Sequence, residues 1–227
     1  MNRTTTPVIL SACLLAALTC CGPKAAASNL LVDPEFDGIP ALNSLATVFG
    51  PPFITGQWGA ENGAIVGVDG GVTPLTARTM LAEYSPAGGY TQTMQVTDVS
   101  SFPASSAFTL SAYFNANLNV PAAKGFVNLS FYDASYSPVG AAVSAGLILD
   151  NNPATWEQIS LTLTEPLTTK YVVSQVLYDE STLVSNGAVW PGYVDSASLT
   201  VVPEPSCFAL LGAGAIGLAA RAWRRRF

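Results

Sequence analysis

The chain contains no histidine and few charged residues, and both shortages restrict its chemistry. Of its 227 residues, 9 are Lys or Arg and 15 are Asp or Glu, so charged residues make up 11%. An ordinary soluble domain carries about 25%. Without histidine, the chain can build neither a Ser-His-Asp or Cys-His nucleophile nor an imidazole metal site. Hydrophobic residues still make up 49%, which is enough to bury a core.

Cysteine is also scarce, and none lies in the central part of the chain. The four cysteines are Cys13, Cys20, Cys21 and Cys207. Residues 28–202 can therefore form no disulfide, although compartments outside the cytoplasm permit disulfides. The same 175 residues carry three basic and fourteen acidic side chains, a net charge of −11. That balance disfavours binding to nucleic acid or anionic lipid by charge.

The first 27 residues are predicted to be a secretory signal peptide. Residues 8–18 form an apolar run of 11 residues, shorter than the roughly 20 that a membrane-spanning helix needs. Small residues at 25–27 offer a cleavage site before Ser28. Two alternatives stay open at this stage: an uncleaved anchor, and a lipoprotein acylated at Cys20 or Cys21.

The other end of the chain combines a proline motif, an apolar run and a basic cluster. Residues 206–223 would form a helix about 27 Å long, close to the roughly 30 Å of a hydrocarbon core. The arginines that follow the apolar run favour a cytoplasmic C-terminus. On these features alone, residues 203–227 could be a permanent single-pass anchor.

The order of these features resembles the PEP-CTERM sorting signal of Gram-negative bacteria. The matching residues are Pro203, Glu204, Pro205, Arg224, Arg225 and Arg226. The resemblance implies that an exosortase recognises the tail and that the apolar helix is a temporary hold. Together with signal peptidase, it implies an inner-membrane-anchored precursor whose product reaches the periplasm, the outer surface or the extracellular matrix.

Between the two ends, residues 28–202 are predicted to form an antiparallel β-sandwich of the jelly-roll type. Apolar and polar residues alternate at 108–114, 127–131 and 159–163, as in strands with one buried face. Gly, Pro, Asn and Asp punctuate the segments, and about nine or ten strands are expected. The other expected strands are 30–32, 64–68, 79–84, 90–96, 143–149, 171–178 and 193–201, and a long loop is expected at 38–63.

This central part resembles the carbohydrate-binding-module jelly rolls of the galactose-binding-like superfamily. The resemblance rests on the opening segment 29–37 and the closing segment 193–199, with few identical residues. It implies that the first and last strands lie side by side. It also implies a structural Ca²⁺ held by Asp37 and Asp195, although Ser196 replaces a second acid of the family pattern. The alternative is that both aspartates are solvated turn or strand-end residues.

Trp58 and Trp190 lie in turn-rich segments and are the predicted ligand-binding residues, because aromatic faces stack on sugars. The alternative for both is packing of a loop against the sandwich. No pair of carboxylates is placed for glycoside hydrolysis, so no enzymatic activity is expected. The sequence therefore predicts an exported cell-surface or exopolysaccharide-matrix protein with a non-catalytic carbohydrate-binding-like domain. The alternative is a structural matrix protein with no small ligand.

Overall fold

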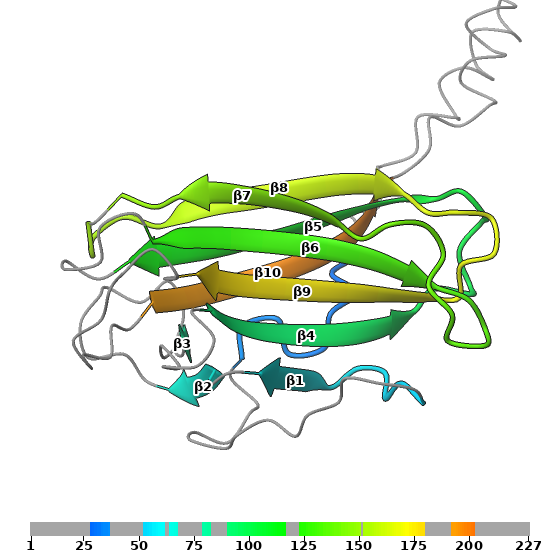
Figure 1. The fold of residues 1–227 in the computed structure, drawn as a ribbon, viewed down its shortest axis with the longest axis horizontal. Coiled ribbons are helices and arrows are strands. Elements are labelled where there is room, and N and C mark those ends of the chain that lie inside the picture. The colour runs from blue at the N-terminus through cyan, green and yellow to red at the C-terminus, as the bar shows by residue number, and fades with distance from the viewer. Residues whose placement is uncertain are drawn as a thin grey trace, which may run out of the picture. The chain divides into compact units, whose positions relative to one another are not determined.

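Two five-stranded sheets form the fold of the described part of the chain. The computed structural model describes residues 28–36, 52–61, 64–67, 79–82, 90–116, 123–150, 152–179 and 192–202. The sheets belong to one compact unit, Asn29–Val202, and pack face to face (Figure 1). The predicted signal peptide and the predicted C-terminal helix lie outside the described residues. In the described part, no helix is long and apolar enough to cross a membrane.

One sheet, called sheet A, has the strand order β1-β4-β9-β6-β7. The other, sheet B, has the order β2-β3-β10-β5-β8. Every pair of neighbouring strands in both sheets is antiparallel. The bounds are β1 Trp58–Glu61, β2 Ala64–Gly67, β3 Thr79–Ala82, β4 Tyr90–Asp98, β5 Ala107–Ala116, β6 Lys124–Tyr132, β7 Val143–Ile148, β8 Glu157–Thr164, β9 Tyr171–Asp179 and β10 Gly192–Val202.

The predicted antiparallel sandwich is confirmed, and two details of the strand assignment are wrong. Residues 30–32 form bends and not a regular strand. Within the predicted loop at 38–63, Trp58–Glu61 forms strand β1. This four-residue strand shows no apolar-polar alternation, and it forms because it pairs with β4, with Trp58 opposite Gln95.

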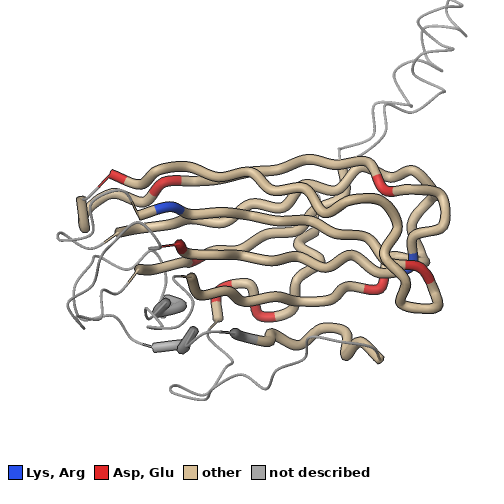
Figure 2. The backbone as a smooth tube through the Cα atoms, in the orientation of Figure 1, with Lys and Arg blue, Asp and Glu red and all other residues tan. Residues whose placement is uncertain are grey.

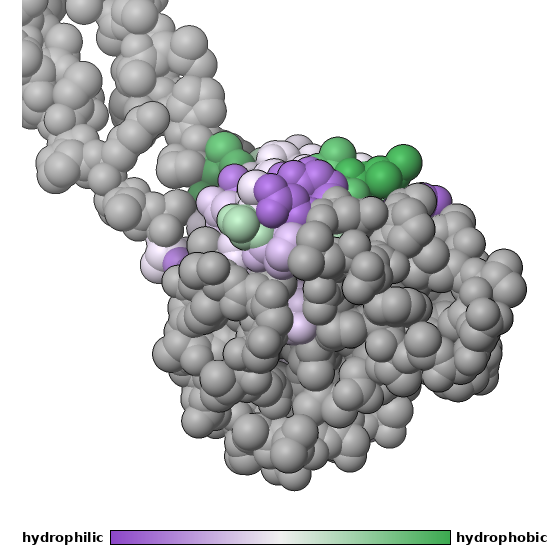
Figure 3. All heavy atoms as spheres, turned by 90° about the vertical axis from the view of Figure 1, so that its left-hand side faces the viewer, coloured by the Kyte–Doolittle hydropathy of each residue, from purple (hydrophilic) through white to green (hydrophobic). Residues whose placement is uncertain are grey.

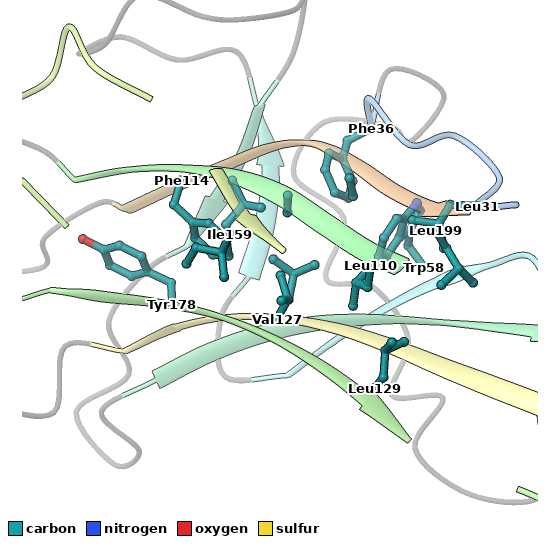
Figure 4. Close-up of a cluster of buried hydrophobic side chains, with 14 of the residues drawn as sticks. Leu31, Phe36, Trp58, Leu110, Phe114, Val127, Leu129, Ile159, Tyr178 and Leu199 are labelled. Carbon is teal, nitrogen blue, oxygen red and sulfur yellow. The ribbon is translucent and has the colours of Figure 1, made fainter. Parts of the chain in front are cut away.

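The core lies between the sheets and follows the alternation of the sequence. On β5 the side chains of Phe108, Leu110, Ala112 and Phe114 are fully buried. On β6, Val127 and Leu129 are equally buried, and they approach the first group from the opposite sheet (Figure 4). A side chain on such a strand points away from the core at every other position. The outward residues of β6 are therefore the even-numbered ones, among them Phe126 and Asn128.

In sheet A, charged residues lie at the ends of the strands and leave the middle of the sheet neutral (Figure 2). Asp98, Lys124 and Asp179 each occupy the first or last position of a strand. Strand β7 carries no charge at all. Sheet A is therefore stabilised by apolar packing and neutral hydrogen bonds.

Glu165 is an exception, because this acid is buried next to β8. Its side chain is 5% exposed, and its Oε2 atom has no hydrogen-bond partner among the residues that the structure describes. Burial raises the pKa of Glu165 above its ordinary value, and a hydrogen bond from the backbone of Ser106 lowers it by a smaller amount. The folded state therefore holds the proton more tightly than the unfolded state.

We predict that Glu165→Gln stabilises the fold at neutral pH but not at acidic pH. Below the unfolded pKa of about 4.5 the carboxyl is protonated in both states, and its burial carries no charge penalty. As the pH rises through the folded pKa, the wild type loses stability relative to the variant. Urea unfolding at pH 4 and pH 7 measures the difference, with the same comparison for Glu157→Gln, a half-buried acid at the start of β8, as control. Equal differences at both pH values would contradict the account.

Candidate ligand-binding face and ion site

The outer face of sheet A is the side of that sheet that points away from sheet B. Strand register places its residues in rows that cross the strands. One row joins Met94, Gln175, Asn128 and Ser144, on β4, β9, β6 and β7 in that order. A neighbouring row contains Phe126, which lies two residues before Asn128 on β6 and on the same face of the sheet. The centre of this face thus combines amides, a hydroxyl and an aromatic ring.

Asn128 and Gln175 form an amide pair at the centre of this face. The Nδ2 atom of Asn128 donates to Oε1 of Gln175 at 2.7 Å, and both side chains are half-buried. The Oδ1 atom of Asn128 is buried and accepts no hydrogen bond in the described part of the chain. The pair therefore presents the neutral donor group of Gln175 at this face, whereas the acceptor atom of Asn128 is buried.

Phe126 provides an apolar ring next to this pair. Its Cδ1 and Cε1 atoms occupy the space that a Cβ atom on Gly146 would need. Register pairs Phe126 with Gly146 on one side and with Leu177 on the other. Glycine at position 146 therefore lets the ring lie down on the sheet, where Phe126 is half-buried.

An aromatic cluster lies at one end of the same face. Tyr136 stacks on Tyr171 with ring centroids 5.4 Å apart and an interplanar angle of 14°. Phe53 meets Tyr132 edge to face at 4.9 Å. A hydrogen bond with the Tyr171 hydroxyl raises the pKa of Tyr136 above its ordinary value. These rings pack on buried apolar residues of β4 and β9, namely Met94, Val96 and Val173.

The backbone of Tyr136 is held in the left-handed region, with φ at 62°. Asp133 maintains this turn, because its Oδ1 accepts the N–H groups of Ser135 at 2.8 Å and Ser137 at 3.0 Å. The turn thereby aims the Tyr136 ring back at Tyr171.

Trp58 is a packing residue, which corrects its prediction as a ligand contact. The side chain is 6% exposed, and its ring lies 4.8 Å from that of Phe36. Its indole N–H donates to the carbonyls of Val32 at 3.0 Å and Asp33 at 2.9 Å. Register explains the burial, because β1 directs Trp58 to the core side of sheet A. Trp190, the other predicted contact, lies outside the described residues.

The opening segment 28–36 is fixed to both sheets, and this is called the N-terminal clamp. On sheet B, the Asn29 side chain donates to the carbonyl of Ala197 at 2.9 Å and accepts the N–H of Leu199 at 3.0 Å. On sheet A, fully buried Gln95 bonds both backbone groups of Val32, at 2.7 and 2.8 Å. The expected proximity of the first and last segments is thus observed, through side chains more than through a regular strand ladder.

The predicted ion site falls at a bulge in β10. The register between β10 and β5 shifts between Asp195 and Ser198. Asp195 is fully buried, and its Oδ1 accepts the N–H of Ser196 at 2.7 Å. The Ser196 hydroxyl donates to Oε2 of Glu35 at 2.7 Å. Two carboxylates from the opening and closing segments therefore bracket Ser196.

This oxygen-rich arrangement fits the donor chemistry of Ca²⁺, which takes carboxylate, carbonyl and water oxygens. The other predicted ligand, Asp37, lies outside the described residues. Within the ranges that the structure describes, no three acidic, His or Cys side chains gather into a complete metal site.

Sequence reasoning missed Phe126, Asn128 and Gln175. It used the alternation of β6 to find the buried residues and passed over the outward ones. The outward positions of Asn128 and Phe126 on β6 could have been recognised from the sequence. The pairing of Asn128 with Gln175 could not, because it depends on β6 lying beside β9.

A comparison with protein families identifies the C-terminal segment. Residues 201–226 match the model described as the PEP-CTERM protein-sorting motif. The chain carries a PEP-CTERM sorting motif. The motif indicates an exported protein sorted by an exosortase, as predicted. No curated protein sequence matches this chain.

The β-sandwich is similar to solved carbohydrate-binding folds at low sequence identity. A protein from Bacteroides thetaiotaomicron VPI-5482 named for sugar binding has a TM-score of 0.53 and 9% identity, covering 77% of this chain and 100% of that one. TmCBM61, solved with β-1,4-galactotriose, gives 0.47 and 13%, covering 78% and 100%. A CBM 22 xylan-binding domain gives 0.45 and 15%, covering 79% and 97%. The likeness to the first of these structures supports the predicted β-sandwich fold, and likeness at this level of identity says nothing about a ligand.

We predict that Gln95→Leu lowers the free energy of unfolding by about 1–3 kcal/mol. The substitution keeps the volume but leaves the N–H and carbonyl of Val32 facing an apolar side chain. Exposed Gln158→Leu on β8 is the control and should change stability by less than about 0.5 kcal/mol. Chemical denaturation measures both variants. Equal effects would show that the Gln95 bonds do not hold the segment.

Proposed function

We propose that this exported protein binds a neutral polysaccharide, without catalysis, on the outer face of sheet A. The observation that carries the proposal is the Asn128–Gln175 amide pair beside the ring of Phe126. Carbohydrate sites combine such groups, because sugar rings have apolar faces and hydroxyls that both donate and accept.

The uncharged side chains at the centre of the outer face favour a neutral ligand. Asn128, Gln175 and Ser144 carry no charge, and the nearest outward charged residues lie at strand ends. The nearest outward cation, Lys124, lies two residues from Phe126 and opposite Asp179, so a sulfated or carboxylated polysaccharide would meet a cation with an acid beside it. The chain's excess of acids over bases also repels an anionic polymer.

The proposed action is binding because the outer-face groups suit no acid–base step. Amides do not titrate near neutral pH, and hydrogen bonding moves the pKa of Tyr136 upward, away from neutrality. Hydrolysis of a glycoside requires two carboxyl groups flanking the bond. The centre of this face offers amides and an aromatic ring in their place.

Sorting would deliver this domain to the cell surface or to an exopolysaccharide matrix. In the proposed sequence of events, signal peptidase removes residues 1–27 and the apolar tail holds an inner-membrane-anchored precursor. An exosortase then acts at the motif beginning with Pro203. Strand β10 remains paired with β5 as far as Val202, so the folded domain extends to the residue before that motif.

Ca²⁺ would be held by Asp195 and Asp37, with Glu35 close to the same bulge. The ion would cross-link the opening segment to β10 and supply no reaction chemistry. Trp190 remains a proposed ligand contact alongside the outer face.

We predict that Phe126→Ala and Asn128→Ala each weaken polysaccharide binding about 10-fold or more. One lost stacking or hydrogen-bonding contact of roughly 1.4 kcal/mol corresponds to that factor. Affinity electrophoresis of the full chain in gels containing neutral polysaccharides measures the effect. Trp190→Ala tests the remaining predicted tryptophan in the same gels.

Tyr113→Ala is the matched control, because Tyr113 is a half-buried aromatic on the outer face of sheet B. It should leave retardation in the gel unchanged. If no neutral polysaccharide retards the wild type, the protein is instead a structural matrix component with no small ligand. Sugar release from a labelled polysaccharide would contradict the non-catalytic role.

We predict that Ca²⁺ raises the melting temperature of the chelator-treated protein. A ligand present at 100 times its dissociation constant adds about 2.7 kcal/mol to stability. Asp195→Asn should abolish the rise, whereas Asp150→Asn, an exposed acid elsewhere, should retain it. Scanning calorimetry with and without Ca²⁺ measures the shift. No shift in the wild type would eliminate the ion site.

A further inference from the structure

Strand β7 is an unprotected sheet edge. It is the last strand of sheet A and, among the strands that the structure describes, pairs with β6 alone. Proteins usually protect such edges with charges, proline, bulges or very short strands. β7 has six residues with no charge and no proline. The edge strands β1 and β2 have four residues each, and β8 begins with Glu157.

Hydrophobic side chains gather on this edge. Val143, Leu147 and Ile148 are 39%, 42% and 61% exposed. They account for three of the seven large hydrophobic side chains that are exposed in the described part of the chain. In the end-on view, green hydrophobic surface lies at the top beside purple hydrophilic groups, where β7 ends and β8 begins in Figure 1 (Figure 3).

We propose that β7 pairs antiparallel with β7 of a second copy of this chain. Directly opposite residues in such a pair point to the same face. With Ala145 opposite Ala145, Val143 of one copy faces Leu147 of the other. Val143 and Leu147 both lie on the core side of sheet A, opposite Leu129 and Gly125 on β6. This register therefore brings two half-exposed apolar side chains together on each side of the symmetry axis.

The charges at the ends of β7 favour a second copy in the antiparallel direction. Acids lie beyond the C-terminal end, where the N–H of Asp150 donates to Glu157 at 2.7 Å. The residues before the N-terminal end, 138–142, are uncharged. Antiparallel pairing sets each acidic end beside the partner's neutral end. Parallel pairing would place like charges together. Because β7 itself has no charge, a second acidic chain meets no repulsion along the strand.

The pairing would produce a two-fold symmetric dimer with one continuous sheet. A two-fold axis perpendicular to the sheet leaves both outer faces of sheet A on the same side. Two polysaccharide sites would then face one polymer and strengthen attachment through avidity. The dimer itself does not depend on any ligand.

Sedimentation of the full chain in density-matched detergent tests the proposal. The wild type should sediment as a dimer and Leu147→Lys as a monomer, because each lysine would face Val143 of the second copy and lose its hydration. Leu167→Lys is the matched control, since Leu167 is 77% exposed and belongs to the segment between β8 and β9 and not to β7. It should remain dimeric. A monomeric wild type, or the same mass for both variants, would overturn the proposal.

Cross-linking tests the register on the same protein. Ala145→Cys, in a chain whose four native cysteines are replaced by serine, should form a covalent dimer with a short cross-linker that carries two thiol-reactive groups. Leu167→Cys in the same background should not. Equal yields from both variants would overturn β7 pairing. Gel retardation by polysaccharide, measured on Leu147→Lys, separates this proposal from the binding function, because the outer-face residues are unchanged.

Discussion

The N-terminal clamp is the interaction on which the rest of the sandwich depends. Residues 28–202 contain no cysteine and so no disulfide, and the clamp adds hydrogen bonds to the apolar packing between the two sheets. Asn29 bonds to β10, Gln95 holds Val32 from β4, and Trp58 caps the same segment from β1. All of these are neutral hydrogen bonds between buried or half-buried groups. They tie the chain's opening segment to its last strand, just before the sorting motif begins.

The clamp also separates the structural side chains from the functional ones. Trp58 has a structural role, because its ring is buried and its indole N–H donates to the carbonyls of Val32 and Asp33. Phe126, Asn128 and Gln175, on the outer face of sheet A, take no part in the hydrogen bonds that hold segment 28–36. With charges confined to strand ends, the face suits a neutral partner. The uncharged edge at β7 extends the same face toward a second copy.

Much of the fold was predictable, because one-sided burial imposes a period of two on each strand. The alternation at 108–114 and 127–131 identified the core residues that the structure buries. β1 was not predictable, because Trp58–Glu61 has no alternation and forms only by pairing with β4. The amide pair was not predictable either, since it joins β6 to β9, 47 positions apart in the chain. Trp58 was predicted as a ligand contact because it lies in a turn-rich segment, and the sequence gives no sign of its ring contact with Phe36.

The central claim is that a neutral polysaccharide binds across β6 and β9 on the outer face of sheet A. Chemical-shift mapping of backbone amides during titration with a neutral oligosaccharide tests it most directly. The account predicts shifts concentrated at residues 126–130 and 174–177, with residues 109–113 on β5 unchanged. Shifts concentrated on β5 and β8, or no shifts with any neutral oligosaccharide, would contradict it.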